Sequence, residues 1–315
     1  MSMDTPVQPR QAGPLRRAWE SDLAWSYRGS PVAVAASITA AVLIGLAVLA
    51  PWVAPHTPFD ASTLDLMEGF SPPGEASPVT GRVFLMGTDG QGRDVFSAVL
   101  YGSRVSLLVG FASVLFSFVF GVSLGLLSGY VGGRTDALIM RIADIQLSFP
   151  AILIALLVFG VARGLIEPAH HEQAAIAVLI VAIGLSNWAQ YARTVRGSTL
   201  VEKNKDYVLA ARVMGRSGAA IMGQHVLPNV IGPVLVIGTI NLALAIIEEA
   251  TLSFLGVGVP PTQPSLGTLI RVGQQFLFSG EWWILLFPAC TLVLLALSIN
   301  LLGDWLRDAL NPKLR

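Results

Sequence analysis

Residues 105–133 read VSLLVGFASVLFSFVFGVSLGLLSGYVGG and contain no charged side chain. A helix needs about 20 apolar residues to cross the ~30 Å hydrocarbon core of a bilayer. This stretch is therefore long enough to span a membrane. Five further intervals are also free of charge: 31–53, 145–162 (which we expect to begin near Ala137), 173–192, 217–247 and 282–303. The sequence predicts an all-α polytopic membrane protein with six transmembrane helices.

The composition of the whole chain agrees with this class. Of 315 residues, 53% are hydrophobic and 13% are charged, whereas a soluble domain carries about 25% charged residues; the mean hydropathy is +0.65. An ordinary cytosolic enzyme is excluded. The net charge is zero, so no overall positive field attracts nucleic acid. Cys290 is the only cysteine, which excludes a disulfide framework and a multi-cysteine metal site.

The basic residues predict the orientation of the six spans. The first apolar segment exceeds the roughly 7–15 residues of a signal-peptide core, so we expect an uncleaved anchor. On one side of the membrane lie Arg82, Arg93, Arg104, Arg163 and Arg271, and every other Lys and Arg lies on the opposite side. The positive-inside rule then places both termini in the cytoplasm. Two long loops result, an external one at 55–104 and a cytoplasmic one at 193–228.

We expect no catalytic residue, no metal site and no bound cofactor in this chain. A Walker A loop needs a Gly-Lys pair, but Glu202, Asn204 and Pro312 precede the only lysines. No serine-hydrolase context is present. His170, His171 and Glu172 lack helical metal-ligand spacing, and the glycine-rich stretch 89–94 reads as a turn because it lacks the spacing of a calcium loop.

Four charged residues at the edges of the spans call for an interpretation. Arg141 and Asp144 are three residues apart, a spacing that predicts a structural ion pair on one helix face. Glu248 and Glu249 lie where the fifth span reaches the external side. Adjacent helical residues point about 100° apart, so at most one of the two would face a central path, and the other would meet a loop or headgroups.

Glycine and proline positions predict close packing and bends. Gly121, Gly125, Gly129 and Gly133 repeat every four residues, a pattern that lets a second helix approach closely. Whether that contact slides or is static stays open. Pro150 and Pro288 fall inside the third and sixth spans, where each removes a backbone hydrogen bond and bends the helix.

The cytoplasmic loop 193–228 contains a short helix. Asp206 is an N-cap candidate, residues 207–214 form a helical run, and Gly215 occupies the usual position that ends a helix. A second turn over residues 217–225 leads to Leu227-Pro228 and the fifth span. A short helix on the cytoplasmic face is suited to docking into a groove of a partner.

At this loop the chain resembles the inner-membrane permease subunits of ATP-binding-cassette (ABC) importers. Their signature is Glu-Ala-Ala, three residues, Gly, nine residues and x-x-Leu-Pro. The matching positions, which the resemblance implies couple to the ATPase, are Leu209, Ala210, Ala211, Gly215, His225, Leu227 and Pro228. The spacing matches the signature throughout. The sequence departs from the signature at one position, where Leu209 replaces the acidic residue.

Further motifs resemble the dipeptide/oligopeptide/nickel group, on its second (C-type) permease. They are residues 85–94, 140–144 with 149–150, 249–256, and 300–304 with 307–308 and Pro312. The resemblance runs from about residue 32 to 315. It implies a type I permease domain at 31–315 after a cytoplasmic tail at 1–30. The simplest interpretation of the basic residues in that tail, Arg16, Arg17 and Arg28, is that they set the topology. An alternative is that part of the tail lies along the membrane surface as an amphipathic segment, which Trp19 and Trp25 suggest.

The resemblance also implies partners and a mechanism. These are a second homologous permease, two ATPase subunits that hold ATP and Mg, and an extracytoplasmic substrate-binding protein, all at the bacterial inner membrane. Candidate residues of the path or gate are Glu248, Glu249, Ser253 and Phe254. The first expectation for the cargo is di- or oligopeptides, followed by nickel chelates, glutathione-like peptides or opines. Two other classes stay open, an ATP-independent channel or carrier and a membrane scaffold or sensor.

Overall fold

The apolar segments fold as long helices. The structure, a computed structural model, describes residues 22–59, 64–77, 80–260 and 262–310. Helices long and apolar enough to cross a membrane contain α3 (Pro31–Val48), α5 (Val95–Val131), α8 (His171–Glu202), α11 (Leu227–Phe254) and α13 (Trp283–Leu310). In the described part of the chain no β-strand forms, and only two isolated bridges occur, in the external loop. The all-α membrane fold is confirmed.

The third segment differs from the prediction of one bent span. It consists of α6 (Gly133–Leu147) and α7 (Ala151–Leu165), which meet at 101°. Pro150 therefore separates two helices instead of bending one. The side-chain amide of Gln146 holds the end of α6 in place, because its Nε2 donates to the carbonyls of Leu185 (2.6 Å) and Ser186 (2.9 Å), while Trp188 Nε1 donates to Gln146 Oε1 (2.6 Å).

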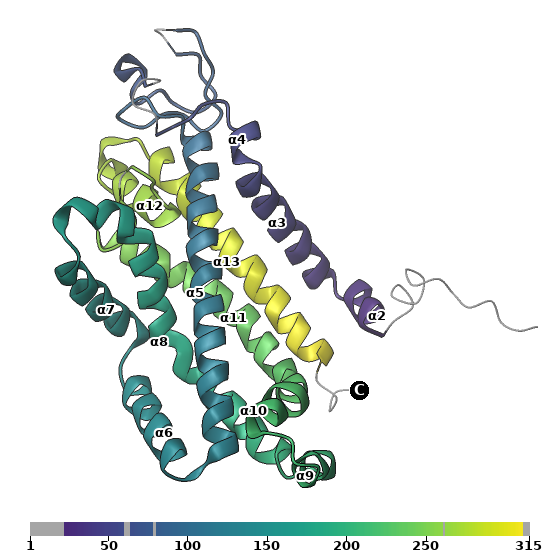
Figure 1. Cartoon of the computed structure of the whole chain (residues 1–315). Coiled ribbons are helices and arrows are strands. Elements are labelled where there is room, and N and C mark those ends of the chain that lie inside the picture. Colours follow the sequence, from purple (N-terminus) through teal and green to yellow (C-terminus); the bar gives the residue numbers. More distant parts are fainter. Residues whose placement is uncertain (1–21, 60–63, 78–79, 261, 311–315) are drawn as a thin grey trace, which may run out of the picture.

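The bundle is arranged around α5. In Figure 1, α5 runs through the middle, with α8 and α11 beside it and α3 and α13 to one side. At one end lie the loop before α5, α4 (Ala50–Val53) and α12 (Leu266–Gln274); at the other lie α9 (Asp206–Val213) and α10 (Gly218–Ile221). Three 3-10 turns complete the described chain: η2 (Leu66–Glu68), η3 (Pro168–His170) and η5 (Leu277–Ser279).

Three of the four predicted stripe glycines pack against α8. A Cβ atom on Gly125 would lie 2.4 Å from the carbonyl oxygen of Ala192, and Gly121 and Gly129 have equally little room. Gly133 does not belong to this contact: it begins α6 with a positive φ of 58°, and nothing lies within 4 Å of its Cβ position. The glycine stripe therefore brings the α5 and α8 backbones together, as small residues do in membrane bundles.

Both ends of the described chain lie at the same end of the bundle. The helix α2 (Asp22–Gly29) packs on α13, where the rings of Tyr27 and Trp305 meet edge to face at 5.3 Å. Figure 1 shows α2 and the end of α13 in the half of the bundle that carries α9. Pro288 lies inside α13 as predicted. The interpretations of Arg16, Arg17, Trp19 and Pro312 fall outside the described residues.

The stretch 89–94, which the sequence predicts to be external, is a hydrogen-bonded turn. Asp89 Oδ1 accepts from the backbone N–H groups of Gln91 (2.8 Å) and Arg93 (3.0 Å). Burial raises the pKa of the Asp89 carboxyl above its ordinary value, an effect that these two hydrogen bonds oppose. The indole Nε1 of Trp283 donates to the carbonyl of Thr88 at 3.0 Å, which ties this turn to the start of α13.

Candidate functional site

The short cytoplasmic helix predicted between Asp206 and Gly215 is α9. It begins at Asp206, with Lys205 and not Asp206 at the N-cap. Gly215 has a φ of 75°, and its N–H donates to the carbonyl of Arg212 at 3.0 Å, while the N–H of Arg216 donates to the carbonyl of Ala211 at 3.1 Å. This pair of bonds is the Schellman motif, which needs a left-handed residue and therefore favours glycine.

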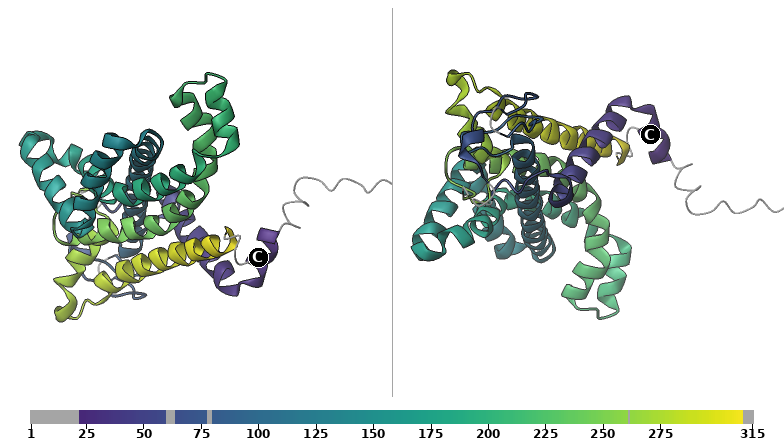
Figure 2. Two further views of the ribbon diagram at one scale, coloured as in Figure 1. Left: turned by 90° about the horizontal axis from the view of Figure 1, so that it is seen from below. Right: turned by 90° about the horizontal axis from the view of Figure 1, so that it is seen from above.

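The two faces of α9 differ. Val208 and Ala211 are buried in a cluster with residues of α5, α8 and α11. On the other face Leu209 is 42% exposed, Val213 89% and Met214 73%. The described molecule thus presents an apolar patch of these three side chains, which we call the α9 patch. Figure 2 shows the α9–α10 segment projecting from the side of the bundle, where a partner can reach it.

Tyr207 connects α9 to the helices on both sides of it. Its hydroxyl donates to a carboxylate oxygen of Glu202 at the end of α8 and accepts from Asn229 Nδ2 of α11 at 3.0 Å. The carbonyl of His225, 3.3 Å from the same hydroxyl oxygen, is an alternative acceptor for its single proton. Desolvation and the Glu202 carboxylate raise the pKa of Tyr207 to about 12, so the phenol keeps its proton. Tyr207 therefore links α9 to the end of α8 and to the start of α11.

The Leu-Pro part of the signature lies at a change of helix type. Residues Met222–Val226 form a π-helical turn, η4, which joins α10 to α11. Pro228 has no backbone N–H and cannot make the usual helical bond, and π-turns often mark functional positions. His225 is half-buried, Leu227 is half-buried and Pro228 is exposed. The predicted motif positions thus extend from α9 through η4 to the first residues of α11.

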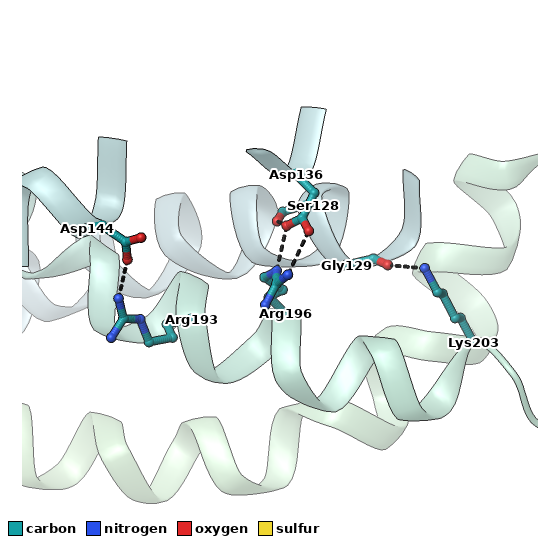
Figure 3. A network of polar contacts seen from close by, with 7 residues as sticks. All are labelled: Ser128, Gly129, Asp136, Asp144, Arg193, Arg196 and Lys203. Atoms are coloured by element: carbon teal, nitrogen blue, oxygen red, sulfur yellow. Dashed lines mark hydrogen bonds and ion pairs between the residues drawn. The ribbon is translucent and has the colours of Figure 1, made fainter. Parts of the chain in front are cut away.

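Ion pairs fasten α6 to α8 (Figure 3). Arg196 donates to both carboxylate oxygens of Asp136, and Lys203 Nζ donates to the carbonyl of Gly129 at 2.7 Å. Asp144 pairs with Arg193 of α8. The predicted pair of Asp144 with Arg141 is therefore wrong: α6 packs on α8, and the guanidinium of Arg193 on that helix reaches Asp144.

Glu248 and Glu249 have different neighbours, as their angular separation predicts. Glu249 is fully buried and accepts from Ser106 Oγ (2.6 Å) and Ser253 Oγ (2.7 Å), which fastens α11 to α5. Glu248 is half-buried and accepts from Asn187 Nδ2 of α8 at 2.8 Å. Glu249 also lies within hydrogen-bonding reach of Ser265, at the end of the loop that leads from α11 to α12, and whether either glutamate faces a central path stays a prediction. Phe254, the remaining path candidate, is half-buried.

Several residues of this region escaped the sequence analysis. Tyr207, Glu202 and Asn229 are spread over three helices, and Asp136 and Arg196 are separated by 60 positions. A usable signal existed only for Asn229, which follows the Leu-Pro motif directly. For the others, the partner becomes known only when the helices are placed against each other.

The comparisons with known proteins agree with this architecture. Residues 121–315 match the family described as binding-protein-dependent transport system inner membrane component. The chain belongs to this family. Residues 13–73 match the N-terminal transmembrane domain of oligopeptide transport permease C, so the likeness begins further upstream than the expected start near residue 32. The chain is accordingly a multi-pass permease of the inner membrane.

Curated relatives cover almost the whole chain. The dipeptide transport system permease protein DppC of Haemophilus influenzae is 35% identical over 99% of this chain and 99% of its own length. The di/tripeptide permease protein DppC of Pseudomonas aeruginosa is 36% identical over 96% and 93%, and the oligopeptide permease protein OppC of Bacillus subtilis is 36% identical over 92% and 88%.

A solved structure supports the fold. A chain of the MetNI methionine ABC transporter in an inward facing conformation superposes with a TM-score of 0.53 at 22% identity, over 68% of this chain and 97% of that one. The ABC importer permease fold predicted from the sequence is confirmed.

Proposed function

We propose that this chain is one of two permease subunits of an ATP-driven importer for di- or oligopeptides. The other subunit is a homologous permease, the two enclose one path, two ATPases bind from the cytoplasm, and a substrate-binding protein delivers cargo outside. The observation that carries the proposal is α9: a helix closed by a Schellman motif, with an exposed apolar patch, bonded to both neighbouring helices. Peptide cargo rests on the relatives named above for peptides.

The contacts of α9 suggest how closure of the ATPases moves the bundle. A partner pressing on the α9 patch displaces a helix whose inner face is part of the core cluster of Val208, Ala211 and Ile221. Through Tyr207 this displacement reaches the end of α8 and the start of α11. In the external half, α11 carries Glu248 and Phe254, which we propose line or gate the path. Glu249 and Ser253 are bonded to each other inside the bundle, so they act on the path through the position of α11.

Co-purification tests the assignment to an importer. The tagged chain is isolated from native membranes in mild detergent, and the bound proteins are identified by mass spectrometry. A second multi-span permease and ATPase subunits support the proposal. A chain that is recovered alone, or only with copies of itself, and that moves solute without ATP supports the channel or carrier class.

A matched pair of variants tests the role of α9. Gly215→Val places a β-branched residue at a φ of 75°, a conformation that costs a non-glycine residue about 1–2 kcal/mol, and deforms the end of α9. Gly223→Val in η4 adds the same side chain where nothing lies within 4 Å of the Cβ position. We expect Gly215→Val to reach the membrane in normal amounts but to uncouple ATPase activity from peptide uptake. Gly223→Val should retain coupling. Normal coupling in Gly215→Val contradicts the assignment.

A further inference from the structure

A cavity of about 470 Å³ opens at the end of the bundle opposite α9. Its walls come from the end of α7, the start of α8, the loop after α11, and α12. In Figure 1 these elements lie in the upper left part of the bundle. By the orientation derived from the basic residues, this is the external end. The volume lies within the range of about 300–1,000 Å³ that is usual for small-molecule sites.

Two guanidinium groups line this cavity without a carboxylate partner. Arg163 comes from α7 and Arg271 from α12. Within residues 22–59, 64–77, 80–260 and 262–310 neither forms an ion pair, and the only hydrogen bond of Arg163 is a long one, 3.5 Å, to His171 Nδ1. The Nε atom of Arg271 is buried and has no acceptor among these residues. A buried donor on a charged group is costly unless an acceptor is supplied.

The chain also leaves room for the Arg271 side chain. Gly256 has a φ of 80°, and a Cβ atom there would lie 3.1 Å from Nη1 of Arg271. The rest of the lining combines apolar side chains, among them Phe159 and Val259, with one carboxylate, Glu172, which accepts from the hydroxyl of Thr262. The cavity therefore offers cationic, anionic and apolar groups together. These groups complement the carboxylate, the ammonium group and the small side chains of a zwitterionic ligand.

We propose that this cavity binds a small zwitterionic peptide, with its carboxylate held by Arg163 and Arg271. Planar guanidinium groups match the two oxygens of a carboxylate and form strong charge-assisted bonds with it. Glu172 faces the same space and accepts the peptide ammonium. The inference rests on the proposed peptide import and adds to it a contact site on the permease itself, outside the path candidates of α11.

Binding to the complete importer tests the site. The complex of both permeases and the ATPase subunits is purified without the substrate-binding protein into phosphatidylcholine nanodiscs, and the dissociation constants of dialanine and dialanine amide are measured by calorimetric titration. We expect dialanine to bind, and the amide, which lacks the carboxylate, to bind about tenfold more weakly. Arg271→Gln and Arg163→Gln should each weaken dialanine binding about tenfold and leave the amide unaffected. Arg163 is exposed, so its variant does not depend on refolding a buried position.

Arg82→Gln is the matched control, because Arg82 is also external but does not line this cavity. Equal affinity for dialanine and its amide in the unmodified complex, or unchanged affinity in both cavity variants, overturns the proposal. A lipid ligand is the other outcome to look for. If native mass spectrometry shows phospholipid bound only when both arginines are present, and dialanine does not bind, the cavity holds a lipid phosphate. That result also overturns the peptide proposal.

Peptide uptake measured in parallel separates the two proposals. If cells with the unmodified chain take up labelled dialanine but the arginine variants bind and transport it normally, the cavity proposal fails and the importer assignment stands. If the unmodified chain supports no peptide uptake, the proposed function fails instead.

Discussion

Arg196 of α8 holds Asp136 of α6 by two parallel bonds, from Nε to Oδ1 at 2.5 Å and from Nη2 to Oδ2 at 2.7 Å (Figure 3). Ser128 at the end of α5 donates to the same carboxylate. One acidic residue thus joins three helices at the end of the bundle that carries α9 and α10. The fork of a guanidinium is required for this geometry, because a lysine ammonium is a point charge that cannot pair with both oxygens in the same plane.

The first prediction concerns this pair. Arg196→Lys retains the charge but loses the two-bond geometry, and we expect it to lower the free energy of unfolding by about 1 kcal/mol, the scale of a partly exposed pair. Thermal unfolding in detergent measures the change. Arg193→Lys is the control, since Arg193 contacts Asp144 through a single atom at a more exposed site, and an equal loss there would show that the fork adds nothing.

The second prediction concerns the α5–α8 contact. Gly125→Ala places a Cβ atom 2.4 Å from the carbonyl oxygen of Ala192, so the two backbones must separate. Overpacking of this kind costs about 1–3 kcal/mol. Gly160→Ala makes the same change in α7, where nothing lies within 4 Å, and should leave stability unchanged or slightly raised, because alanine is the better helix former. Similar melting temperatures for the two variants would contradict the close contact.

The distribution of charged residues predicted the membrane segments. An unpaired charge in hydrocarbon is costly, so a stretch of about 20 residues without any charged side chain indicates a span. The end of α9 was equally predictable, since Gly215 occupies a position that few other residues tolerate. The break at Pro150 was not. A proline in an apolar run can bend or end a helix, and its position alone does not distinguish the two outcomes. Here the end of α6 is bonded through Gln146 to α8 carbonyls, a contact between helices that the local sequence does not reveal. The partner of Asp144 escaped for the same reason, because it lies on another helix.

The third prediction concerns the pH dependence of the external turn. Because the pKa of Asp89 is raised in the folded protein, the fold favours its protonated form. The ionised carboxylate therefore destabilises the protein above the folded-state pKa, and this penalty disappears as the pH falls toward the ordinary aspartate value of about 4. Asp89→Asn keeps an Oδ1 acceptor for both turn N–H groups without the charge.

We expect Asp89→Asn to melt at a higher temperature than the unmodified chain at neutral pH, with a difference that shrinks on acidification. Melting curves between about pH 4 and pH 7 measure this. Asp65→Asn is the control, because Asp65 is exposed and also accepts from a turn N–H, that of Met67 at 2.9 Å. A difference that is constant over the pH range would show that the Asp89 charge is not what the fold disfavours.

The last prediction concerns Leu209, which occupies the acidic position of the signature that this chain resembles. Leu209 lies in the first half of α9 beside the exposed Val213 and Met214. If a partner covers the α9 patch, a glutamate at this position is buried without a counter-charge, which is strongly unfavourable. Leu209→Glu should therefore weaken co-purification with the ATPase subunits at least ~10-fold, a change of about 1.4 kcal/mol. Leu209→Ala, which removes apolar area alone, should have a smaller effect.

The charge itself does not harm the helix, since an acidic residue near a helix N-terminus interacts favourably with the helix dipole, so membrane abundance should stay normal. Asn204→Glu adds the same charge just before α9, outside the patch, and should retain ATPase binding. Tighter binding by Leu209→Glu would instead mean that the partner surface carries a basic residue opposite position 209 and that the acidic signature still determines docking in this importer.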